Sequence, residues 1–168
     1  MIRPAVSGHA RPKTTRRNRQ RRDDPKKILV GSDGHETGGW ALDHAKRLAA
    51  AMEDAALLVV YVIEWSPHSF QTEAENAERH KRRLEEVVAA QDRIVDPAVA
   101  ALAKAGGTAS GLVHHGDVAD KLHRLAEENG ADLIVIGRAS KRGFSQRLFG
   151  SSGVNLAMYS TIPVTVAG

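Results

Sequence analysis

The stretch GRASKRGFSQRLFGS, from Gly137 to Ser151, carries most of the information about the fold and ligand of this chain. It follows the apolar run Leu133–Ile136 and precedes a segment of helical character, Ser152–Tyr159. A strand, a glycine-rich loop and a helix start leave backbone N–H groups free, and the helix dipole favours an anion there. The stretch therefore predicts a site for a phosphate-containing ligand, with a nucleotide as the first hypothesis. Four loop cations also suit phosphate: Arg138, Lys141, Arg142 and Arg147.

Length and composition indicate one folded domain. The chain has 168 residues, of which 42% are hydrophobic, and this is sufficient for a single core. The sequence contains no cysteine, which excludes a disulfide framework, thiol catalysis and a Cys-based zinc site, and which fits a reducing, cytoplasmic setting. No apolar stretch is long enough to span a bilayer, so we expect no membrane association.

The positive charge is concentrated at the N-terminus. Residues 1–27 hold 10 of the 24 Lys and Arg and only two acids, so this segment is +8 and the remainder is −4. We expect residues 1–25 to form a disordered basic tail, because they contain too few apolar residues to offset the entropy of ordering. The first interpretation is that the tail is an arm that binds nucleic acid or an acidic partner. The second is that it is a solvated extension, or the product of a misassigned start codon. The lack of interleaved aromatic residues favours the second interpretation.

Hydrophobic periodicity predicts strands and helices in alternation. Within the longest helix, Pro97 predicts a kink or break after Asp96. The run Thr108–His114 is less apolar than the other strands, which places it nearer to a sheet edge. The expected strands are Lys27–Gly31, Ala56–Ile63, Thr108–His114, Asp132–Ile136 and Val164–Ala167, and the expected helices are Thr37–Met52, Glu73–Lys104, Asp117–Asn129 and Ser152–Tyr159.

This β-α-β-α-β-α-β-α-β order predicts an α/β fold, in which one doubly wound, five-stranded parallel sheet is sandwiched by helices. Ligands of such sheets bind beyond the carboxyl ends of the strands, at a topological switch point. Asp33 follows the first strand and Gly137 follows the fourth. Both residues are therefore expected at the ligand-binding edge.

These residues together resemble the universal stress protein family over residues 26–168. The family signature is Gly, two residues, Gly, nine residues, Gly, then Ser or Thr. Three of its four positions match, because serine replaces the second glycine. Supporting marks are Asp33 after the first strand, Gly116-Asp117 before the third helix, Gly130 to Asp132 before the fourth strand, and Pro163-Val164 opening the last. The four signature positions are Gly137, Ser140, Gly150 and Ser151.

The resemblance implies the universal stress protein fold, which is similar to that of the adenine nucleotide alpha hydrolases. It also implies a homodimer formed through the last strand, Val164–Ala167. In members that bind ATP, with Mg²⁺, the first-strand Asp and a second-strand Val lie near ribose and adenine, and the glycine-rich loop holds the phosphates. The binding residues so implied are Ser32, Asp33, Val62, Gly137, Ser140, Gly150, Ser151 and Ser152.

Ser140 leaves two functions open. Glycine serves where φ is positive or where backbone approaches a ligand closely. A serine side chain can crowd a phosphate or donate a hydrogen bond to it. The first reading is a dimeric, ATP-binding stress-response protein. The second is a dimeric protein-interaction module that binds no nucleotide, and a third reading is nucleic-acid association through residues 1–25.

Other chemistry has weaker support in the sequence. His114 and His115 point to opposite faces of a strand, so they are poor joint metal ligands, and no carboxylate or Cys pattern near His35 completes a site. The sequence contains no Gly-x-Ser-x-Gly elbow, Walker A pattern or Gly-x-Gly-x-x-Gly. Because no positioned general base is evident, we expect nucleotide binding with at most weak ATPase activity. No catalytic or metal-ligating residue is assigned.

Overall fold

Strands and helices alternate along the chain, and the computed structural model describes residues 26–52, 55–64, 73–138 and 150–168. The strands of this part are β1 (Lys27–Ser32), β2 (Ala56–Glu64), β3 (Ala109–Gly116), β4 (Leu133–Gly137) and β5 (Val164–Ala167). The helices are α2 (Glu36–Ala51), α3 (Glu73–Ala90), the π-helical segment η1 (Gln91–Val95), α4 (Asp96–Lys104), α5 (Val118–Glu128) and α6 (Gly150–Tyr159).

The strands form one parallel sheet in the order β3-β2-β1-β4-β5. This confirms the predicted doubly wound α/β fold, and β3 is an edge strand as its composition predicted. The chain builds outward from β1 through β2 to β3, then crosses back to β4 and continues to β5. The topological switch point is therefore the carboxyl-end crevice between β1 and β4.

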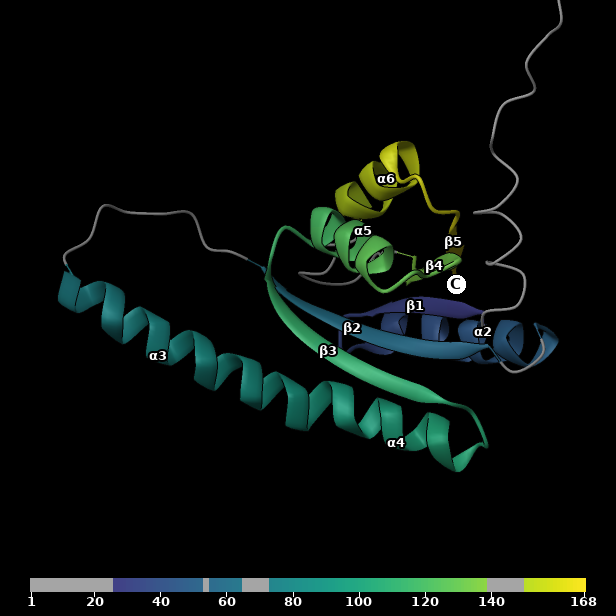
Figure 1. The fold of residues 1–168 in the computed structure, drawn as a ribbon, viewed down its shortest axis with the longest axis horizontal. Coiled ribbons are helices and arrows are strands. Elements are labelled where there is room, and N and C mark those ends of the chain that lie inside the picture. Colours follow the sequence, from purple (N-terminus) through teal and green to yellow (C-terminus); the bar gives the residue numbers. More distant parts are fainter. Residues whose placement is uncertain (1–25, 53–54, 65–72, 139–149) are drawn as a thin grey trace, which may run out of the picture.

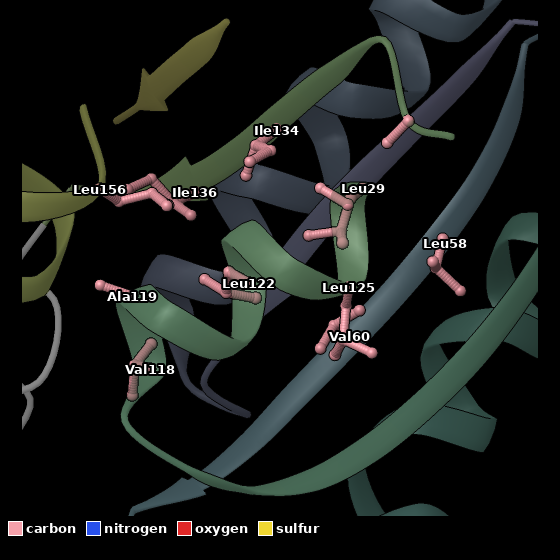
Figure 2. Close-up of a cluster of buried hydrophobic side chains, with 12 residues drawn as sticks. Leu29, Leu58, Val60, Val118, Ala119, Leu122, Leu125, Ile134, Ile136 and Leu156 are labelled. Carbon is pink, nitrogen blue, oxygen red and sulfur yellow. The ribbon is translucent and has the colours of Figure 1, made fainter. Parts of the chain in front are cut away.

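One face of the sheet packs against α5 and α6, which lie together on the same side in Figure 1. Figure 2 shows Leu29 of β1, Leu58 and Val60 of β2 and Ile134 of β4 in one buried cluster with Leu122 and Leu125 of α5. Complete burial of a Leu or Ile side chain contributes about 1.5–3 kcal/mol. This cluster therefore holds α5 on the central strands.

The opposite face packs against α2 and α4. Ile28 and Val30 alternate with Leu29 along β1, so they face the second cluster. The small residues Ala41, Ala45 and Ala49 lie along the buried side of α2 and are at most 7% exposed. Because alanine projects little from the helix, α2 can lie close to the sheet.

The expected break at Pro97 takes a different form. Helix α3 passes through the π-helical segment η1 into α4, and Figure 1 shows one continuous rod. Pro97 lies in the first turn of α4. Proline donates no N–H to the carbonyls of the preceding turn, and the wide π turn accommodates the lost hydrogen bond without a break in the helix. Val95 of this turn touches the position where Gly111 would carry a Cβ, so η1 is also a close contact point with β3.

Both expected ends of α5 are confirmed. The Asp117 side chain accepts a hydrogen bond of 2.9 Å from the backbone N–H of Asp120 at the start of the helix. Gly130, with φ of +65°, follows the C-terminal residue Asn129 in the left-handed region. Among the described residues, no helix has both the length and the apolar character needed to cross a membrane.

Candidate nucleotide site at the strand ends

The carboxyl ends of β1 and β4 lie side by side at the switch point. Gly31 of β1 is opposite Ile136 of β4, so the chain leaves both strands within two residues of this pair. Asp33 and Gly137 therefore lie at the same edge, as the order of elements predicted. Ser32 and Asp33 are the two buried polar residues of the described chain, with exposed fractions of 4% and 8%.

Asp33 holds the start of helix α2. Its Oδ1 accepts hydrogen bonds from the backbone N–H groups of His35 at 2.9 Å and Gly38 at 3.0 Å. These are donors of the first turn, which lack intrahelical partners. The carboxylate also lies at the positive end of the helix dipole, which favours its charge. One oxygen thus has a structural role, and Asp33 has further interactions beyond these two bonds.

Gly38 allows this arrangement. A Cβ placed on it would lie 2.7 Å from Asp33 Oδ1, 2.9 Å from Ser32 Oγ and 3.0 Å from the Asp33 nitrogen. The sequence alone presents Gly38 and Gly39 as residues that weaken the helix, but the two differ. Nothing lies within 4 Å of a Cβ on Gly39. Gly38 is therefore required by close packing, and Gly39 is not.

Tyr61 of β2 also lies at the site, although no motif in the sequence indicates it. It is opposite Ser32 in the β1–β2 register. Burial, and next the charge of nearby Asp33, raise the pKa of the Tyr61 hydroxyl. Val62 follows it and points to the other face, where it packs against the α5–α6 cluster. Aligning the strand ends in the sequence would have placed Tyr61 beside Asp33.

Acidic groups gather at the ends of β2 and β3. Glu64 ends β2 opposite Gly116, and Asp117 follows directly. Burial, and next the charge of Asp117, raise the pKa of the Glu64 carboxyl. At the other side of the switch point, Arg138 leaves β4, exposed, with its backbone N–H donating to the Ala167 carbonyl at 2.7 Å. The edge is thus negative at β2–β3 and positive beyond β4.

Helix α6 begins next to this positive side. It starts at Gly150, two residues earlier than expected, so Ser151 and Ser152 lie in its first turn. Gly153 is buried, and a Cβ on it would lie 3.1 Å from Ile136 Cδ1. This close approach sets the N-terminal end of α6 against β4. Ser140 and the cations Lys141, Arg142 and Arg147 lie outside the described residues.

The histidines do not form a metal site within the described part of the chain, where no group of three or more His, Cys, Asp or Glu is arranged to hold an ion. His114 and His115 lie at the end of β3, opposite Val62 and Ile63. The His115 Nε2 atom is 2.9 Å from Glu86 Oε2 of α3. This contact ties α3 to the sheet edge.

A doubly wound parallel sheet places the chain in the α/β class, in which ligands bind beyond the carboxyl ends of the strands at the switch point. The family model for the universal stress protein family matches residues 25–168, and the chain belongs to that family. A comparison with curated protein sequences gives no match.

Solved structures agree with this assignment. A universal stress protein family member from Burkholderia pseudomallei is 28% identical with a TM-score of 0.59, over 84% of this chain and 94% of that one. A universal stress protein in complex with cAMP is 27% identical with a TM-score of 0.59, over 85% and 96%. The universal stress protein UspA from Lactobacillus plantarum, at 20% identity and a TM-score of 0.67 over 85% and 97%, shares the fold.

Proposed function

We propose that this universal stress protein binds an adenine nucleotide, ATP with Mg²⁺, at the carboxyl edge of its sheet. The observation that carries the proposal is the adjacency of buried Asp33 and the β4 end at the switch point. Asp33 and Val62 would lie near ribose and adenine. The phosphates would lie against the segment that holds Gly137, Ser140, Gly150, Ser151 and Ser152.

The uneven charge of the edge supports one orientation of the nucleotide. Glu64 and Asp117 would repel phosphates from the ends of β2 and β3. Arg138 and the N-terminal end of α6 favour them beyond β4. The base and ribose would therefore lie toward β1 and β2. The bound cyclic nucleotide of the 27% identical structure is consistent with a nucleotide at this family's site.

The proposed activity is binding, with at most weak hydrolysis. Asp33 is engaged in capping α2, so it is poorly suited to activate a water molecule. When bound, Mg²⁺ would be coordinated by the phosphates and would neutralise their charge. A bound nucleotide would act on Gly137–Gly150 and change the surface that partners recognise. Unchanged hydrogen exchange of that segment at saturating ATP would contradict this regulatory step.

We also propose that the protein is a homodimer formed through β5 and located in the cytoplasm. Strand β5 is an edge of the sheet, so one side of its backbone has no strand partner within the described chain. Val166 on this strand is 52% exposed. An exposed edge with an apolar side chain favours pairing with another strand.

Thermal unfolding with and without ATP tests the nucleotide proposal. A ligand that binds only the folded state stabilises it by about 2.7 kcal/mol at a concentration 100 times its Kd. We expect ATP to raise the unfolding temperature of the wild-type protein. No shift would favour the second candidate, a dimeric interaction module in which Ser140 has disabled the site.

Nucleic-acid association through residues 1–25 is a third candidate, supported only by the charge of +8 in residues 1–27. Phosphate contacts make such binding fall steeply with salt. Substitution of the arginines at 16, 17, 19, 21 and 22 by serine would then abolish binding to duplex DNA at low salt. Absence of DNA and RNA binding by the wild-type chain would contradict this candidate.

A further inference from the structure

The π-helical segment η1 directs two consecutive side chains toward the body of the domain. Val95 is completely buried and Ile94 is half-buried, although consecutive residues of an α-helix point about 100° apart. The inward positions of α3 lead from buried Ala90 to Ile94, one turn later, and those of α4 lead back from buried Leu102 to Val95. These two series differ in register by one residue. The wide π turn accommodates the difference and allows both side chains to point inward.

Each of the two side chains lies against a glycine. Val95 occupies the position where Gly111 of the edge strand β3 would carry a Cβ. A Cβ placed on Gly34 would lie 3.0 Å from Ile94 Cδ1, 3.3 Å from its Cγ1 and 3.4 Å from its Cγ2. The Ile94 side chain therefore covers the Cα of Gly34. Segment η1 thus contacts both the edge strand β3 and the turn that follows β1.

The turn that Ile94 covers is the one that carries Asp33. The Asp33 Oδ1 atom accepts the N–H groups of His35 at 2.9 Å and Gly38 at 3.0 Å, so these bonds are local to the turn and the start of α2. Between Asp33 and His35, Gly34 has a φ of +73°, and glycine has the widest conformational range of any residue. Ile94 restricts this glycine from a distant part of the chain.

We infer that Ile94 is a positioning residue for nucleotide binding: it holds the Gly34 turn so that the Asp33 carboxylate keeps its place at the carboxyl end of β1. Ile94 acts through Asp33 and does not itself touch the ligand. Because protein interiors are close-packed, three side-chain carbons over one glycine oppose displacement of the turn. This inference rests on the proposed function and deepens it, since it gives the π turn of the long helix a role in ligand affinity.

Ile94→Ala tests the inference through two readouts on the full-length chain. The first is amide hydrogen exchange of His35 and Gly38 relative to the amides of β1, because core strands exchange through global unfolding. We expect this exchange ratio to rise by about fivefold or more. The second readout is the Kd for MgATP, which we expect to rise by about fivefold or more. Ile94→Leu keeps the apolar volume and should leave both within about twofold of wild type.

Val95→Ala is the matched control, because it shortens a side chain of the same π turn at the contact with Gly111 instead of Gly34. It is expected to lower global stability but to leave the exchange ratio and the Kd within about twofold of wild type. Circular dichroism verifies that each variant is folded. Wild-type values of both readouts in Ile94→Ala, or equal changes in Val95→Ala, would overturn the inference. A wild-type chain that binds no ATP would contradict the proposed function, and the exchange ratio would then decide by itself whether Ile94 positions Asp33.

Discussion

Asp33 and Gly38 are coupled through one carboxylate oxygen, which accepts the Gly38 N–H at 3.0 Å and which would lie 2.7 Å from a Cβ on that glycine. The close approach lets the same aspartate end the central strand and start helix α2. The residue that caps the helix is therefore held in place at the carboxyl edge of the sheet. The capping role of Asp33 and its proposed role in nucleotide binding can be tested separately.

Substitution of the two adjacent glycines by alanine is expected to have opposite effects. Gly39→Ala should stabilise the protein by about 0.5–1 kcal/mol, because alanine has the better helix propensity and nothing lies near its Cβ. Gly38→Ala should destabilise it by about 1–3 kcal/mol, because the Cβ meets the Asp33 backbone as well as its side chain. Urea unfolding of both variants measures the difference. Equal effects would show that Gly38 makes no close contact.

Asp33 substitutions separate the cap from the ligand role. Asp33→Asn keeps an oxygen acceptor for the helix and should cost little stability. Asp33→Ala removes it and should cost about 1–2 kcal/mol. If Asp33 also accepts a ribose hydroxyl, alanine should weaken ATP binding by roughly tenfold or more. Unfolding curves and ATP titrations are measured on the same samples. An alanine variant with weakened stability and unchanged ATP affinity would confine Asp33 to capping.

The Glu64 carboxyl gives a pH-dependent prediction. Burial, and next the charge of Asp117, raise the pKa of this carboxyl in the folded state above its ordinary value. As the pH rises, the unfolded chain loses this proton first. Glu64 therefore lowers stability progressively between the unfolded and the folded pKa, and to the full extent above the folded pKa. Glu64→Gln should stabilise the protein at neutral pH and have little effect near pH 3.5. A stability gain of the same size at both pH values would exclude the electrostatic cause.

Because η1 contacts β3, we expect substitutions at Val95 and Gly111 to be energetically coupled. Gly111→Ala should destabilise the protein by about 1–3 kcal/mol, because its Cβ would overlap Val95. Val95→Ala leaves a cavity and should also destabilise it. The double variant should lose less than the sum, since the smaller side chain makes room for the added methyl group. Additive losses in a double-mutant cycle would contradict a direct contact.

The sequence predicted the architecture because β1, β2 and β4 are short apolar runs separated by amphipathic helices. The sequence located the irregularity at Pro97 but did not predict its form. A break and a π turn can both accommodate the hydrogen bond that proline cannot donate. The need for glycine at position 38 was not predicted, because its close packing against Asp33 is a tertiary contact. Tyr61 and Glu64 were missed because their neighbours come from other strands and from α5. The placement of Ser140 near the phosphates of a bound nucleotide stays a prediction.

Isothermal calorimetry of the full-length protein with MgATP, alongside Ser140→Gly, tests the central claim most directly. We predict saturable binding to the wild type, with equal or tighter binding to the glycine variant. Binding by Ser140→Gly alone would mean that one side chain has disabled an otherwise formed site. Absence of binding by both proteins, with each shown to be folded, would contradict the assignment of the strand ends as a nucleotide site.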